Sequence, residues 1–185
     1  MAKQFATIDD KLRAFIGGQQ VFFVATAAAV GRINMSPRPT DCLRVIGPNS
    51  VAYRDLTGSG SETAAHLRVD GRMTMLFCAF DGAPLILRLY GRAVSFPAGT
   101  AAFKDVLAKD FDGQSPPGTR QIVLLEIDLV QTSCGYGVPL FDFVGNRDNL
   151  KRWTEHKGEQ GLRAYRQEKN RFSLDGWPSL EIEQA

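Results

Sequence analysis

The stretch AYRDLTGSGSETAAHL, Ala52–Leu67, contains a strand, a helix and an unusual connection between them. Its first residues are typical of a strand, and Ala64, Ala65 and Leu67 suit a helix. Only small, hydroxyl and acidic residues lie between them, at Thr57–Thr63, which we call the junction. Glycine costs backbone entropy on folding. The two glycines here therefore predict a use beyond linking two elements.

Two interpretations of the junction are open. Ser59 and Glu62 have the spacing of a capping box, in which both side chains satisfy free N–H groups at a helix start. Alternatively, the same N–H groups form an anion site, because glycines let a phosphate approach the backbone. The hydroxyls of Thr57, Ser61 and Thr63 would add donors. A capping box leaves these hydroxyls unexplained, which favours the anion.

The rest of the sequence predicts many short strands and few helices. Leu87 and Leu89 alternate with Arg88 and Tyr90, as in a strand with one buried face. Helices are expected near 7–16 and 100–108, and strands over 21–29, 33–36, 42–46, 50–55, 72–80, 85–96 and 120–130. The last strand is expected to bury Val123, Leu125, Ile127 and Leu129. This order favours a mainly β fold, an antiparallel barrel with peripheral helices, over a doubly wound parallel sheet.

The composition indicates one ordinary globular domain over residues 1–185, with a charged, helical C-terminal extension from about 145 to 185. A net charge of +2 gives no reason to expect nucleic acid or membrane as a partner. Three widely spaced cysteines and an N-terminus without a signal-peptide pattern favour the cytoplasm. The two histidines have no metal-ligand spacing, so no metal site is expected. Neither a nucleophile elbow nor a P-loop is present.

Two arginines and a proline-rich segment add to the candidate site. Arg54 precedes the junction, and Arg88 lies on the polar face of a later strand. Arginine binds phosphate through two parallel hydrogen bonds, although either residue could instead pair with a nearby acid at the surface. Pro37 and Pro39 are incompatible with a regular central strand. We therefore expect an irregular segment whose backbone faces a ligand, or a simple surface loop.

Taken together, several stretches resemble the FMN-binding split-barrel proteins related to pyridoxamine 5′-phosphate oxidase. They are INMSPRPTD, VAYRDLTGSGSETAAHL, GRMTMLFCAF, LILRLYGRA and SCGYGVPLFDFVGNRDNL, in order over roughly residues 10 to 170. The resemblance implies a six-stranded antiparallel split barrel that forms a homodimer, with FMN at the subunit interface. It also implies a flavin-dependent oxidoreductase whose substrate the sequence does not identify.

The resemblance places the FMN phosphate at the junction and the flavin ring beside the segment from Asn34 to Thr40. Tyr136 could lie against the flavin of the partner, or form a tight exit turn. The implied cofactor-binding residues are Asn34, Ser36, Pro37, Arg38, Arg54, Asp55, Thr57, Ser59, Ser61, Glu62, Thr63, Arg88 and Tyr136.

One family feature is missing, and it limits what the resemblance implies. The C-terminal Arg-x-His motif of the oxidases is absent, because Thr154 stands two residues before His156 and Ala64 two before His66. Pyridoxamine 5′-phosphate oxidase activity itself is therefore not expected. A flavin-binding or sensor protein without turnover, and a split barrel that uses a deazaflavin or haem, remain as alternatives.

Overall fold

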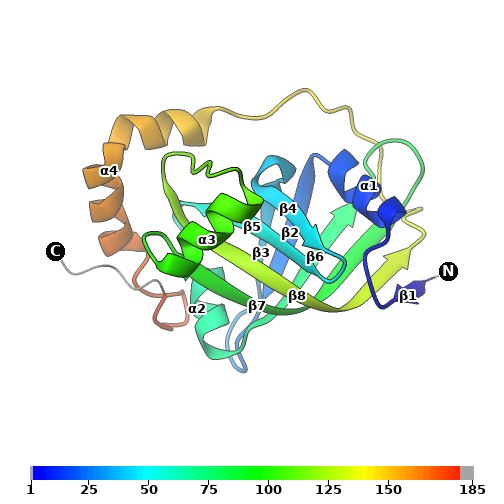
Figure 1. The fold of residues 1–185 in the computed structure, drawn as a ribbon, viewed down its shortest axis with the longest axis horizontal. Helices are drawn as coiled ribbons and strands as arrows, with labels where there is room; N and C mark the ends of the chain where they lie inside the picture. The colour runs from blue at the N-terminus through cyan, green and yellow to red at the C-terminus, as the bar shows by residue number, and fades with distance from the viewer. Residues whose placement is uncertain (1, 180–185) are drawn as a thin grey trace.

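The strands form one antiparallel sheet that curls into a split barrel (Figure 1). A computed structural model describes residues 2–179. The eight strands are β1 (Lys3–Phe5), β2 (Val21–Thr26), β3 (Asn34–Pro39), β4 (Leu43–Gly47), β5 (Ser50–Leu56), β6 (Arg72–Cys78), β7 (Ile86–Pro97) and β8 (Thr119–Ser133). Their order is β3-β2-β6-β7-β8-β5-β4, and β1 pairs with β8. This confirms the predicted fold class, with two strands more than the resemblance implied.

The sheet curls because its two ends are joined by a very short connection. β3 and β4 are the end strands, yet only the 3-10 turn Thr40–Cys42 separates them in the sequence. β4 pairs with β5 as far as Tyr53, so the last residues of β5 have no strand partner on that side. The split in the barrel therefore lies between the end of β3 and the end of β5.

The core fills the inside of the barrel, as the alternation predicts. Leu87 and Leu89 are fully buried, whereas Arg88 and Tyr90 on the other face are partly exposed. The rings of Phe22 and Phe77, on β2 and β6, stack with centroids 5.6 Å apart.

β8 departs from the predicted alternation at one position. Tyr90 pairs with Leu129 but Gly91 pairs with Ile127, so Asp128 is an extra residue in the β7–β8 ladder. The bulge moves Leu129 off the core face and places Val130 in the core, fully buried. The prediction for Leu129 was therefore wrong, because a one-residue shift inverts every later side chain.

The prediction of an irregular segment around the two prolines was also wrong. β3 is a regular strand that pairs along its whole length with β2, from Asn34 opposite Thr26 to Pro39 opposite Val21. The prolines are accommodated because β3 is an edge strand, where a missing N–H need not break a ladder.

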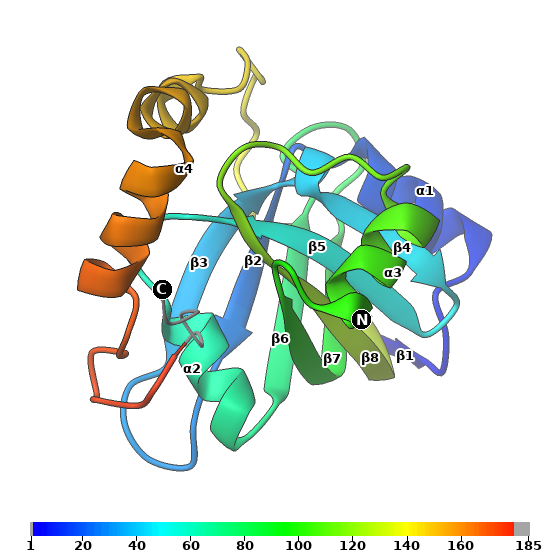
Figure 2. The same ribbon diagram turned by 60° about the vertical axis from the view of Figure 1, so that its left-hand side comes forward.

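Four α-helices surround the barrel: α1 (Asp10–Gly18), α2 (Glu62–Val69), α3 (Ala101–Asp110) and α4 (Asn149–Lys169). α1 and α3 begin at capping residues, Asp9 and Thr100, whose side chains accept backbone hydrogen bonds. α4 confirms the helical extension over its own length and bends at Gly158, where φ is +61°. Both views place α4 on the α2 side of the barrel, away from α1 (Figures 1 and 2). None of the described helices is long and apolar enough to cross a membrane.

Candidate functional site

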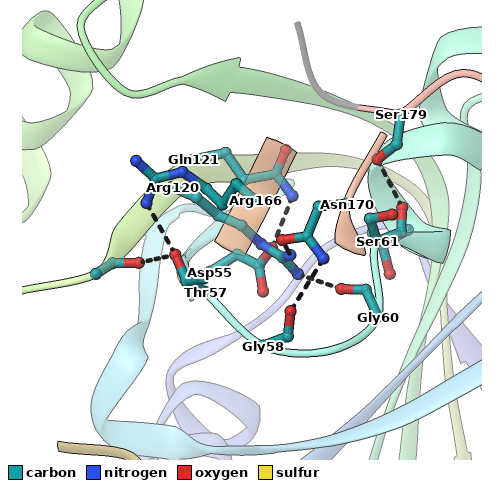
Figure 3. Close-up of polar contacts among 12 residues, drawn as sticks. Asp55, Thr57, Gly58, Gly60, Ser61, Arg120, Gln121, Arg166, Asn170 and Ser179 are labelled. Atoms are coloured by element: carbon teal, nitrogen blue, oxygen red, sulfur yellow. Dashed lines mark hydrogen bonds and ion pairs between the residues drawn. The ribbon is translucent and has the colours of Figure 1, made fainter. Parts of the chain in front are cut away.

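The junction lies at the split of the barrel, between the end of β5 and the start of α2 (Figure 3). The residue before the first turn of α2 is Ser61, and its side chain makes no capping hydrogen bond. Glu62 does not complete a capping box either, because its carboxylate accepts a hydrogen bond from the Leu174 N–H at 3.0 Å. The capping-box interpretation was therefore wrong, since both side chains turn to the C-terminal part of the chain.

Asp55 is the centre of a buried charged network beside the junction. Its carboxylate is fully buried and accepts hydrogen bonds from Arg120 Nε at 2.8 Å and Gln121 Nε2 at 2.7 Å. Arg38 Nη1, from β3, lies 2.6 Å from the other carboxylate oxygen. Burial acts to raise the pKa of Asp55, but the two arginines and these hydrogen bonds outweigh it, so the pKa lies below its ordinary value. The Arg38–Asp55 pair thus joins the two sides of the split.

The junction carbonyls are held by two side chains (Figure 3). Asn170, at the end of α4, is fully buried and donates from Nδ2 to the carbonyls of Gly58 at 3.0 Å and Ser59 at 3.4 Å. Arg120 Nη2 donates to the Gly60 carbonyl at 2.7 Å, and Arg120 Nη1 donates to Asn170 Oδ1 at 2.9 Å. Three successive carbonyls are therefore turned to the protein interior.

The chain after α4 continues this attachment through Ser179, and we call Arg166–Ser179 the strap. Arg166 Nη1 donates to Thr57 Oγ1 at 3.1 Å, and the Ser179 hydroxyl donates to the Ser61 carbonyl at 3.0 Å. The Ser61 hydroxyl itself donates to the Phe172 carbonyl. Asp175 pairs with Arg32 in the β2–β3 loop, so the strap also holds the entry to β3.

The inward row of β3 faces the junction, as period-two alternation requires. Asn34 donates from Nδ2 to Thr63 Oγ1 at 3.1 Å and to Thr26 Oγ1 at 3.3 Å. Ser36 Oγ lies 3.4 Å from Asn34 Oδ1. Pro37, in the alternate row, is exposed. The structure therefore brings most of the predicted β3 residues to the junction, with Pro37 turned away.

Three predicted residues are held elsewhere. Arg54 donates to the carbonyls of Gln114 and Asp41, and its guanidinium lies 5.1 Å from the centroid of the Phe111 ring. Arg88 donates to Ser133 Oγ near the far end of β8, and Tyr136 follows that end with 82% of its surface exposed. Within one chain, none of the three makes a described contact with the junction.

Sequence reasoning did not identify Arg120, Arg166 and Asn170 as site residues. Arg120 is the first residue of a predicted strand, and the other two lie in a charged helix, so no local motif marks them. They lie sixty or more positions from their partners in the junction. Fold alone brings them there.

The comparisons with known proteins agree with this architecture. The family model for pyridoxamine 5′-phosphate oxidase matches residues 8–134. The pyridoxamine 5′-phosphate oxidase family protein ustO of Aspergillus flavus is 37% identical over 192 residues, which cover 95% of this chain and 77% of that protein. Among solved structures, a variant of HupZ from Group A Streptococcus has a TM-score of 0.54 at 19% identity, covering 68% of this chain and 99% of that one. A proposed pyridoxamine 5′-phosphate oxidase from Lactobacillus delbrueckii has a TM-score of 0.53 at 16% identity, covering 68% and 94%. The chain therefore belongs to the pyridoxamine 5′-phosphate oxidase family.

Proposed function

We propose that the protein binds FMN in a homodimer and acts as a flavin-dependent oxidoreductase on a small molecule, with the FMN phosphate at the junction. Family membership together with a junction whose carbonyls are all turned inward is the observation that carries the proposal. Bound flavin supplies hydride or electron transfer, while the protein supplies binding, orientation and electrostatics. Pyridoxamine 5′-phosphate oxidation is not part of the proposal, because the Arg-x-His motif is absent.

The local charge favours an anion at the junction. Arg38 and Arg120 both pair with Asp55, so the two guanidinium groups share one carboxylate. Arg166 adds a third positive charge beside Thr57 and forms no ion pair with a described carboxylate. A phosphate monoester, which carries nearly two negative charges, would offset this excess.

The exposure of the junction also fits a ligand that approaches from solvent. Ser59 and Gly60 are exposed, although their carbonyls are bound from inside. Two buried polar atoms near Asp55, Arg38 Nε and Gln121 Oε1, have no hydrogen-bond partner within residues 2–179. Such atoms are rare in native proteins unless a ligand, water or partner completes them.

The flavin ring has a place next to β3. A cavity of about 370 Å³ is lined by residues of β2, β6 and β7, among them Thr26, which accepts a hydrogen bond from Asn34. Ligand sites of this size commonly bury most of a small molecule. Because Arg88 and Tyr136 lie near the far end of β8, we place them as ring contacts from the second subunit.

A haem alternative has less support from the described residues. Its axial ligand would be histidine, cysteine or tyrosine. His66 is 2% exposed, and its Nδ1 lies 3.0 Å from Thr26 Oγ1. Deazaflavin and turnover-free flavin binding stay as outcomes of the experiment below. A cytoplasmic location remains part of the proposal, on the cysteine pattern.

The visible spectrum of the purified protein tests the proposed function. We expect a yellow protein that releases about one FMN per subunit on denaturation, and that binds FMN more tightly than riboflavin, because a charge-assisted hydrogen bond to the phosphate contributes about 1.5–3 kcal/mol. The check is a pair of fluorescence titrations of the apoprotein. A Soret band would favour haem, and equal affinity for FMN and riboflavin would remove the phosphate from the junction.

A further inference from the structure

The end of α4 presents two side chains to the junction from one helical face. Arg166 and Asn170 are four residues apart, so they lie on the same face of the helix. Arg166 reaches Thr57 Oγ1, and Asn170 reaches the carbonyls of Gly58 and Ser59. Figure 3 shows both side chains directed at the loop between β5 and α2.

Asn170 and Arg120 determine which way the junction amides point. In a trans peptide unit the N–H points opposite to the C=O. Because the carbonyls of Gly58, Ser59 and Gly60 are held from inside, the N–H groups that follow them, on Ser59, Gly60 and Ser61, are turned to the opposite side. Successive N–H groups with a common direction form a concave anion site.

The hydrogen bonds made by the strap leave these donors available. Arg166, Asn170 and Ser179 donate to oxygen atoms of the junction and occupy none of its N–H groups. Arg166 itself is half-buried, and its described hydrogen bond is to a neutral hydroxyl. A guanidinium beside outward N–H groups, without a carboxylate partner among the described residues, is complementary to a phosphate.

We propose that the end of α4 completes the phosphate site: Arg166 contacts the phosphate, and Asn170 is a positioning residue that holds the junction amides toward it. The inference rests on the proposed function and adds to it two residues more than a hundred positions beyond the junction. It makes the C-terminal extension part of the cofactor site rather than an accessory on the barrel.

Arg166→Gln and Asn170→Asp test the two roles. Asn170→Asp keeps the acceptor for Arg120 but removes the donor to the junction carbonyls. We expect each variant to bind FMN about tenfold or more weakly, the loss for one charge-assisted hydrogen bond, and to bind riboflavin as before. Arg163→Gln, on an exposed residue of the same helix, is the matched control and should keep both affinities.

The ratio of FMN to riboflavin affinity separates these roles from a merely structural one. A general loss of packing would lower both affinities and the melting temperature together, and would overturn the proposal. If both variants keep the ratio of the unchanged protein, the end of α4 does not serve the phosphate. If Asn170→Asp does not fold, Arg166→Gln decides. If the unchanged protein itself shows a ratio near one, the phosphate placement under the proposed function fails first.

Discussion

Asp55 stabilises the site through its charge more than through its size. It is fully buried, yet it is ionised, because Arg38 and Arg120 approach it from two different strands. A buried carboxylate with paired arginines is costly to break, since removing one partner leaves uncompensated charge in a low-dielectric interior. Asp55 therefore links the stability of the barrel to the electrostatics of the junction.

Asp55→Asn should lower the free energy of unfolding by about 3–5 kcal/mol at neutral pH, because two buried arginines lose their carboxylate. The pKa of Asp55 is lowered in the folded state. Its contribution is therefore complete above the unfolded pKa of about 4 and is lost as pH falls through the folded value. The gap between the two proteins should narrow in acid.

Urea unfolding of both proteins between neutral and acidic pH measures this gap. Glu159→Gln provides the control, because 89% of the Glu159 side chain is exposed. A gap that stays constant down to the lowest pH would mean that Asp55 is not ionised in the folded protein.

At the scale of elements, the β7–β8 ladder shows why one glycine cannot be replaced. A Cβ built at Gly91 would lie 1.9 Å from the Glu126 carbonyl oxygen, opposite the bulge at Asp128. Neither strand can move away, because both are paired on their other sides. The bulge and the glycine are thus one device that directs the last part of β8.

Gly91→Ala should lower the free energy of unfolding by about 1–3 kcal/mol or more, the range for overpacking in a rigid interior. Gly137→Ala is the control, because a Cβ there would meet nothing within 4 Å. Thermal unfolding by circular dichroism compares the two. Equal melting temperatures would show that the ladder relaxes at this position.

The elements show how far sequence reasoning reaches. Alternation of apolar residues predicted most strands and the faces of β7, because burial follows the pleat directly. It could not predict the bulge at Asp128, which depends on the partner strand, nor that β3 is an edge strand that tolerates Pro37. The hydroxyl-rich junction was recognisable as a candidate anion site. Its partners Arg120 and Asn170 were not, because only the closed barrel and the docked α4 bring them near.

At the scale of the whole molecule, an apolar segment on the surface remains to be explained. Between β8 and α4, residues 134–148 cross the outside of the barrel without strand or helix until the first turn of α4 (Figure 1). Tyr136, Leu140, Phe141, Phe143 and Val144 are all more than half exposed. Contiguous apolar surface of this kind usually marks an interaction site. In the proposed homodimer the partner subunit covers it, which places Tyr136 at the interface where the second subunit would contact the flavin.

The dimer is tested by replacing two residues of this segment together. Leu140 and Val144 are 74% and 99% exposed, so Leu140→Ser with Val144→Ser should leave the folded subunit intact. If the partner buries them, each loss removes about 1.5–3 kcal/mol of apolar burial from the interface, which weakens dimerisation on the order of a hundredfold or more for the pair. Sedimentation equilibrium should then show a dimer for the unchanged protein and a shift toward monomer for the double variant, with FMN bound less tightly because ring contacts come from the partner. Leu174→Ser, on a residue of the strap that is 79% exposed, controls for a general change in surface polarity. A monomer that retains FMN with full affinity would refute the shared site, and a double variant that dimerises normally would place the interface elsewhere on the barrel.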